Sequence, residues 1–323
     1  MIISGLSKRK LSSIVLFFVL VLAGCLIFAQ WSNRENYFSA VQTIGMTWLC
    51  LLLILSLLNY LLRIIRWQNY LRFLGANLPV TLSALIYVAG FALTMTPGKT
   101  GELYRGVFLK TYGVTYTNST AVFVSERISD LSAILLLTLL GTFHQLHWFM
   151  IISVIIVAAI ISLFLSLHTK FPLKFLGNLS RLIHLSSKTG RRWLTLLKEA
   201  RRCHSPRILI SATFLSLLAW SSEAFAFYLL LYKLGFSAGL LFAFSVYALA
   251  TLAGAISFLP GGLGGTEAAM AGLLLMNGMP GTQAIAATVI IRLTTLWFAV
   301  FLGVIALVLG KRVLVSGTEE QGN

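Results

Sequence analysis

The sequence predicts an all-α polytopic membrane protein with about six full spans and two re-entrant helical hairpins that form an inverted repeat. Three observations lead to this prediction. Of the 323 residues, 58% are hydrophobic and 11% are charged, against roughly 45–50% and about 25% in soluble domains. Apolar runs of about 20 residues, enough for a helix to cross about 30 Å of hydrocarbon, recur along the chain. Basic residues gather in a few segments between these runs, a pattern typical of cytoplasmic loops.

We expect a single integral membrane domain over residues 1–323. Its full spans are predicted at 11–29, 46–66, 118–142, 148–167, 208–232 and 282–310. The first run contains Leu22-Ala23-Gly24-Cys25, which is similar to a lipoprotein cleavage site, but its apolar residues continue to Ala29 and favour an uncleaved span. The second span ends near Arg63, Arg66 and Arg72, whose long side chains we expect to reach the inner interface.

The basic residues predict the orientation. Ten of the 25 Lys and Arg residues lie in the segment 168–207, where Glu199 is the only acidic residue, and Lys8, Arg9 and Lys10 precede the first apolar run. By the positive-inside rule, this loop and both termini are predicted to be cytoplasmic, in the cytoplasmic (inner) membrane. Topology then accounts for the net charge of +16, so we do not expect a nucleic-acid partner.

Two apolar segments, 81–110 and 239–277, are interrupted by proline and glycine. The first run stops at Pro97 and the second at Pro260. If both segments are re-entrant hairpins, every basic segment falls on the cytoplasmic side, and the two hairpins enter from opposite faces. Backbone groups freed by proline and glycine are tolerated at membrane depth only where protein buries them or they line a cavity.

The two hairpins resemble each other in sequence. Glu102 and Glu267 are each followed by a glycine after eleven residues and by an arginine, Arg127 or Arg292, after 25 residues. Pro97, Gly98 and Gly101 match Pro260, Gly261 and Gly264, and the second break has two further glycines, Gly262 and Gly265. With opposite orientations, the two copies form an inverted repeat, an architecture that commonly places a substrate site near the bilayer midplane.

Charged residues lie inside the apolar segments. The acidic ones are Glu102, Glu126, Asp130, Glu223 and Glu267, and the basic ones are Lys99, Arg105, Arg127 and Arg292. A charge at the bilayer centre costs about 2.5–3.5 kcal/mol, so each needs a partner or water. Helical spacing predicts that Glu102 pairs with Arg105 and that Arg127 pairs with Asp130, while Glu223 is expected to meet a base of a hairpin. Two roles for these charges remain open: they form structural ion pairs that hold the helices together, or they form a functional polar face.

The hairpin tips have the chemistry of an anion site. A helix that begins after a glycine-rich break presents free N–H groups to an anion. We expect Lys99, Arg127 and Arg292 to bind a phosphate, and Glu102 and Glu267, with Arg105 nearby, to bind a cationic headgroup or a coupling proton; Glu126, Asp130 and Glu223 would support them. The three cysteines and five histidines lack ligand spacing, so no metal and no cofactor are expected.

Three motifs carry a family resemblance: 97–102 (PGKTGE), 125–130 (SERISD) and 260–267 (PGGLGGTE). They resemble the transmembrane region of lysylphosphatidylglycerol synthases, also called the flippase-like domain family, and the resemblance covers nearly the whole chain. It implies that the protein moves a phospholipid or a lipid-linked precursor between leaflets, with membrane lipids, anionic or phosphate-bearing, as partners. The longer members carry a soluble aminoacyl-transferase domain, whereas 13 residues follow the last span here. We therefore do not expect an enzyme that transfers lysine.

Two alternatives stay open. One is a membrane-embedded enzyme of lipid modification or glycosyl transfer, with Glu102, Glu267 or Asp130 as its base. The other is a partner subunit of a separate lipid synthase or glycosyltransferase, in which the buried charges would be structural. The lipid, the direction and energy source of transport, proton coupling and the oligomeric state do not follow from the sequence.

Overall fold

The computed structural model describes residues 34–142 and 205–310, with a few single residues between them, and describes 34–43, 97–100, 141–142 and 206 only by their backbone. Every regular element in these two ranges is helical, in agreement with the predicted all-α class. The expected spans at 11–29 and 148–167, with Cys25, lie outside the described residues, as do most of the basic loop 168–207 and the chain after residue 310.

Three described helices are long and apolar enough to cross a membrane. They are α2 (Arg34–Phe73), kinked at Gly45 and apolar from Ile44 onward; α9 (Pro206–Lys233); and the continuous helix formed by α12 (Gly281–Arg292), η3 (Leu293–Trp297) and α13 (Phe298–Leu309). At 1.5 Å per residue, each is longer than the roughly 30 Å of a hydrocarbon core. They coincide with the spans predicted at 46–66, 208–232 and 282–310.

The fourth long helix, α5 (Tyr116–Thr142), has 27 residues, which is about 40 Å of helix. It matches the predicted span 118–142 in position, but Glu126, Arg127 and Asp130 make its first half polar. Helix α5 packs against α9 and against the second hairpin. The charged half of α5 therefore lies within the helix bundle.

Both segments with proline–glycine breaks fold as helix–break–helix hairpins. The first consists of α3 (Val80–Phe91), η1 (Pro97–Tyr104) and α4 (Arg105–Lys110), and the second of α10 (Leu240–Ile256), η2 (Pro260–Gly262) and α11 (Gly265–Met276). The residues before the two prolines, Thr96 and Leu259, are extended, with ψ of 149° and 151°. Proline disfavours the α conformation in the residue before it, so neither first arm continues through its proline; α3 ends at Phe91 and α10 at Ile256.

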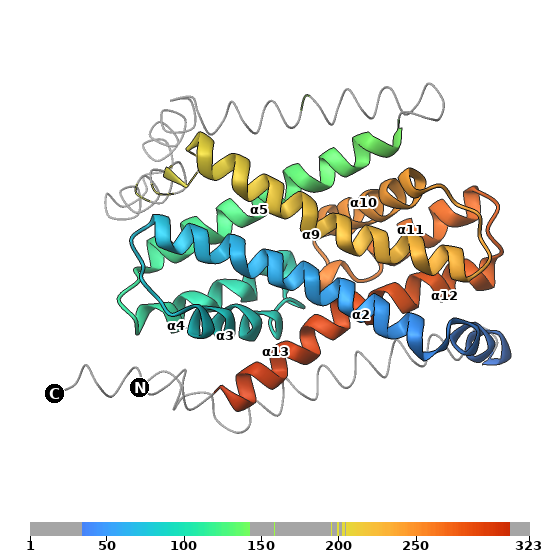
Figure 1. Ribbon diagram of the computed structural model, residues 1–323, viewed down its shortest axis with the longest axis horizontal. Coiled ribbons are helices and arrows are strands. Elements are labelled where there is room, and N and C mark those ends of the chain that lie inside the picture. Colours follow the sequence, from blue (N-terminus) through green and yellow to red (C-terminus); the bar gives the residue numbers. More distant parts are fainter. Residues whose placement is uncertain are drawn as a thin grey trace, which may run out of the picture.

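The hairpins lie at opposite ends of the molecule and meet at their tips. In Figure 1, α3 and α4 lie together at the end where α2 stops and α5 starts, and α10 and α11 lie together at the other end. The tips η1 and η2 are in contact. There the buried side chains of Met95, Leu296 and Val300 form a small hydrophobic cluster, which places the tips against the middle of the α12–α13 helix.

The second arms of the two hairpins end in the same turn. Gly113 and Gly278 have φ of 80° and 86°, the left-handed conformation that glycine adopts at low cost after a helix. The residue that follows each glycine donates its N–H to a carbonyl five residues earlier, at 3.1 Å in both copies. Each glycine lies eleven residues after its hairpin glutamate, so this turn follows both second arms at the corresponding sequence position.

The apolar residues divide between an interior and an outer surface. Buried residues around the first hairpin, including Trp67, Tyr87 and Phe91, form one core cluster, and a larger one surrounds the second hairpin. Large apolar side chains such as Phe214 and Phe301 are exposed on the long helices. An apolar outer surface of this kind suits contact with lipid chains rather than water.

Candidate functional site

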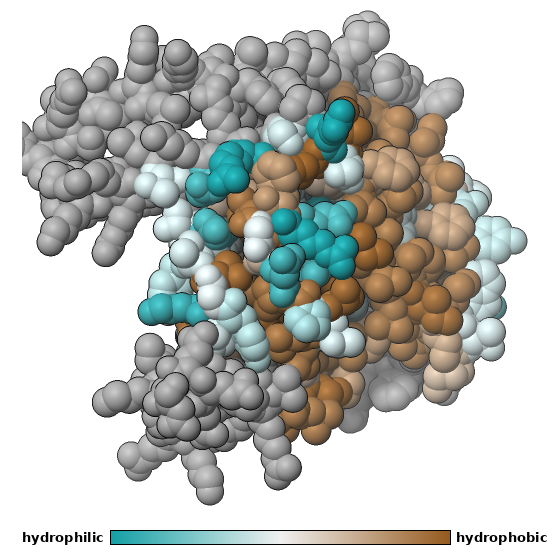
Figure 2. Space-filling model, turned by 60° about the vertical axis from the view of Figure 1, so that its left-hand side comes forward, coloured by the Kyte–Doolittle hydropathy of each residue, from teal (hydrophilic) through white to brown (hydrophobic). Residues whose placement is uncertain are grey.

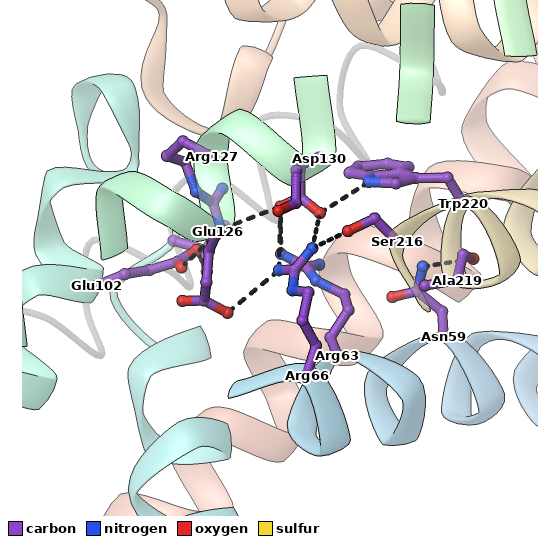
Figure 3. Close-up of polar contacts among 12 residues, drawn as sticks. Asn59, Arg63, Arg66, Glu102, Glu126, Arg127, Asp130, Ser216, Ala219 and Trp220 are labelled. Carbon is purple, nitrogen blue, oxygen red and sulfur yellow. Dashed lines mark hydrogen bonds and ion pairs between the residues drawn. The ribbon is translucent and has the colours of Figure 1, made fainter. Parts of the chain in front are cut away.

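Seven charged side chains form an ion-pair network between α2, the first hairpin and α5 (Figure 3). Its members are Arg63, Arg66, Glu102, Arg105, Glu126, Arg127 and Asp130. Six of them are at most 6% exposed, whereas the side chain of Arg127 is 25% exposed. Buried charges are stable only when they are paired and hydrogen-bonded, and the network provides such pairs across three elements far apart in the sequence.

Arg66 is the centre of this network. Its Nη2 lies 3.1 Å from Glu126 Oε1 and its Nη1 lies 2.5 Å from Asp130 Oδ1, and Nη1 also donates to the Ser216 hydroxyl. Trp220 Nε1 donates to the same Asp130 oxygen at 3.1 Å. Arg66 thus joins α2 to α5 and α9, and charge-assisted bonds of this kind are about twice as strong as neutral ones.

Arg105 connects the first hairpin to the same network. Its Nη2 lies 2.8 Å from Glu102 Oε2, and its Nη1 lies 3.2 Å from Glu126 Oε2. The other oxygen of Glu102 accepts from the Thr94 hydroxyl at 3.1 Å. The guanidinium also lies over the Tyr87 ring, 4.0 Å from its centroid, a favourable cation–π contact. The predicted pairing of Glu102 with Arg105 is confirmed.

Arg127 is the exposed member of the network. Its Nη2 lies 3.3 Å from Asp130 Oδ2, which confirms the second predicted pair, and 3.5 Å from Glu102 Oε2. Its guanidinium also lies 5.3 Å from the centroid of the Phe123 ring. Figure 2 shows hydrophilic residues gathered at the centre of one face, bordered by hydrophobic ones.

The second hairpin has a smaller, partly exposed ion pair. Arg292 Nε lies 2.6 Å from Glu267 Oε1, with side chains 15% and 28% exposed, and Arg292 Nη2 donates to the Gly261 carbonyl at 2.8 Å. Gly264, in the left-handed region at φ 81°, donates its N–H to Glu267 Oε2 at 2.6 Å. The N-terminus of α11, predicted to face an anion, is thus capped by the chain's own carboxylate.

The two ion pairs are equivalent members of the repeat. In each hairpin, the tip glutamate contacts the arginine 25 residues later, Arg127 in one copy and Arg292 in the other. Glu223 lies elsewhere, in α9: it is buried and accepts a hydrogen bond from Tyr247 of α10 at 2.6 Å. The structure thus brings Glu102, Glu126, Arg127 and Asp130 together and keeps Glu223 in a separate contact with the second hairpin.

Comparison with known proteins agrees with this architecture. Residues 12–303 match the family described as the lysylphosphatidylglycerol synthase TM region. The chain belongs to this family. It is also 24% identical over 323 residues to UPF0104 membrane protein PH1989 of Pyrococcus horikoshii, covering 91% of this chain and 96% of that protein. A UPF0104 membrane protein of Methanothermobacter thermautotrophicus is 36% identical over 91 residues, 28% of this chain and 27% of that protein. With its long apolar helices, this family member is a multi-pass membrane protein.

The predicted position of Arg63 and Arg66 at the inner interface is wrong. In this member of the lysylphosphatidylglycerol synthase TM region family, α2 continues to Phe73, seven residues past the predicted end, so both arginines are buried inside the bundle. Arg72, in the last turn, is exposed. The charges of α5 could have predicted this burial. Glu126 and Asp130 share one helix face, and the single positive charge of Arg127 does not neutralise both, so a base from another helix is required.

One predicted phosphate ligand, Lys99, and one buried cysteine, Cys203, are not among the contacts of the site as described. The side chain of Lys99 lies outside the described residues. Cys203, just before α9, is buried, and burial raises the pKa of its thiol to about 11. The thiol is therefore protonated at neutral pH, and a protonated thiol is a poor nucleophile.

Proposed function

We propose that the protein moves the polar headgroup of a phospholipid or lipid-linked precursor between the leaflets of the cytoplasmic membrane. The observation that carries this proposal is the pair of equivalent Glu–Arg contacts at the hairpin tips. The arginine of each pair is partly exposed, Arg127 at 25% and Arg292 at 15%, whereas the other charges of the ion-pair network are buried. An exposed charge at membrane depth is costly unless a polar ligand or water meets it.

The chemistry of the two pairs suits a phospholipid headgroup. A guanidinium binds phosphate oxygens in bidentate fashion, and a carboxylate accepts hydrogen bonds from an ammonium or hydroxyl group. In this mechanism the headgroup passes along Arg127 and Glu102 at one tip and Arg292 and Glu267 at the other. The acyl chains stay in the bilayer beside the apolar outer surface, so that only the polar part requires a path through the protein.

The proposed topology has both hairpins re-entering the membrane from opposite faces, with the termini cytoplasmic. In its support, α3 has 12 residues, about 18 Å of helix, too short to cross about 30 Å of hydrocarbon. The arms of each hairpin also begin and end at one end of the molecule in Figure 1.

Single cysteines introduced into a variant without the native cysteines test this topology. Positions 77 and 115, flanking the first hairpin, are expected to react with an impermeant maleimide from the cytoplasmic side. Positions 237 and 282, flanking the second, should react from the outside. All four positions are exposed. Labelling of the two flanks of one hairpin from opposite faces would rule out the re-entrant arrangement.

Proteoliposomes test the transport function directly. With headgroup-labelled phosphatidylglycerol in both leaflets, an impermeant quencher is expected to reach the inner-leaflet label in wild-type vesicles and only the outer-leaflet label in protein-free ones. Mass spectrometry of the same lipids separates transport from chemistry. Movement with unchanged lipid mass supports the transporter; a new covalent product without movement supports an enzyme and contradicts the proposal.

A further inference from the structure

The ion-pair network contains more positive than negative charge. Its described members are four arginines and three carboxylates, so with every group ionised its net charge is +1. Arg66, Arg105 and Arg127 each lie within salt-bridge distance of two carboxylates. Among the described residues, Arg63 lies within salt-bridge distance of one carboxylate, Asp130, with its Nη2 at 3.6 Å from Oδ2, beyond hydrogen-bond distance. Arg63 is therefore the least closely paired of the four arginines.

The network also has more donors than acceptors. Arg63 is 6% exposed, and neither its Nε nor its Nη2 has a hydrogen-bond partner in the described part of the chain. The Nε atoms of Arg66, Arg105 and Arg127 are also without one. Two aromatic rings flank Arg63: Phe91, with its centroid 5.9 Å from the guanidinium carbon, and Trp220, at 5.7 Å. Rings stabilise a cation but do not accept its N–H bonds. A buried guanidinium with unpaired N–H groups requires a hydrogen-bond acceptor. An oxyanion would accept these bonds and also balance the positive charge.

Arg63 lies next to the exposed end of the network. Its Nη2 and that of Arg127 are both within 4 Å of the same oxygen, Asp130 Oδ2. Figure 3 shows Asp130 between Arg127 on one side and Arg63 and Arg66 on the other. Asp130 keeps its other oxygen bonded to Arg66 and Trp220. Arg63 and Arg127 thus share one oxygen of Asp130, while the other oxygen anchors the carboxylate to Arg66 and Trp220.

We propose that Arg63 and Arg127 together bind the phosphate group of an anionic ligand beside Asp130. This inference rests on the proposed function, which it deepens by adding Arg63 as a phosphate ligand and by naming a first binding position for the headgroup. One anion brings the net charge of the network to zero and supplies acceptors for the free N–H groups of Arg63. The ligand approaches by way of Arg127, the member exposed at 25%.

Two probes distinguish the possible sources of the phosphate. Purified full-length protein in detergent is titrated with sodium phosphate at constant ionic strength, and the midpoint of thermal unfolding is recorded, since a ligand that binds the folded state raises it. In parallel, native mass spectrometry measures the binding of phosphatidylglycerol, with diacylglycerol as the phosphate-free control. Stabilisation by sodium phosphate indicates a site for free phosphate, and binding of phosphatidylglycerol alone indicates a lipid headgroup; either result supports the subsite.

Arg63→Gln is the decisive variant, and Arg72→Gln, on the exposed last turn of α2, is its matched control. We expect Arg63→Gln to weaken binding of the probe by about tenfold or more, because hydrogen bonds to charged groups are lost, and Arg72→Gln to bind as wild type. Without ligand, Arg63→Gln should unfold at the same temperature as wild type or a higher one, because the excess cation is removed. A lower midpoint with unchanged affinity would make Arg63 a counter-ion of Asp130 and overturn the subsite.

Failure of this inference can be told apart from failure of the proposed function. If wild-type protein binds phosphate through Arg63 but moves no headgroup in proteoliposomes, the transport proposal is overturned and the subsite stands. If wild-type protein moves headgroups while Arg63→Gln binds both probes with unchanged affinity, the subsite is overturned and the transport proposal stands.

Discussion

Replacement of Arg66 by glutamine is expected to destabilise the protein by about 3–5 kcal/mol, the typical cost of removing one partner from a buried ion pair. Arg66 lies between Glu126 and Asp130 and also donates to Ser216. Without it, two buried carboxylates one helical turn apart would repel each other. The thermal unfolding midpoint in detergent, with the yield of folded protein, measures the effect.

The contrast with Arg63→Gln makes this prediction specific. Both substitutions remove one positive charge from the ion-pair network, so charge counting alone predicts equal effects. The contacts predict opposite ones, because Arg66 lies within salt-bridge distance of two carboxylates and Arg63 contacts one at 3.6 Å. Arg202→Gln, which breaks an exposed pair with Glu199, serves as a control, with an expected cost below about 1 kcal/mol. An Arg66→Gln protein as stable as wild type would contradict the central role of Arg66.

Arg292→Lys is expected to reduce headgroup movement by about tenfold or more, with protein abundance near normal, because lysine does not replace a bidentate guanidinium. Two nitrogens of Arg292 bind at once, Nε to Glu267 at 2.6 Å and Nη2 to the Gly261 carbonyl at 2.8 Å. A single ammonium group keeps the charge but does not make both bonds in this geometry. The proteoliposome assay measures the rate.

The equivalent variant, Arg127→Lys, tests whether the two tips serve one path. If both arginines act on the same headgroup, the double variant should be far from additive, as expected for residues that share a partner. Lys110→Gln, an exposed base at the end of α4, is the matched control and is expected to transport normally. Transport at the wild-type rate by Arg292→Lys would place the path away from the hairpin tips.

The sequence alone predicted the elements whose cause is local. Composition determined the helical membrane class, and Pro97 and Pro260 determined the extended backbone at Thr96 and Leu259, since proline acts on its own residue and the one before it. The spacing of eleven and 25 residues after Glu102 and Glu267 predicted the repeat, and a glycine turn (Gly113, Gly278) and a Glu–Arg contact occur at the corresponding positions of both copies.

Only the tertiary structure decided which charges neutralise one another. Arg63 and Arg66 looked like interfacial residues because the apolar run of α2 ends near them, yet the helix continues and packs them against α5. Asp130 also meets Trp220 of α9, 90 residues further along the chain. A helix break depends on adjacent residues, whereas the partner of a buried charge depends on which helices pack together and in what register.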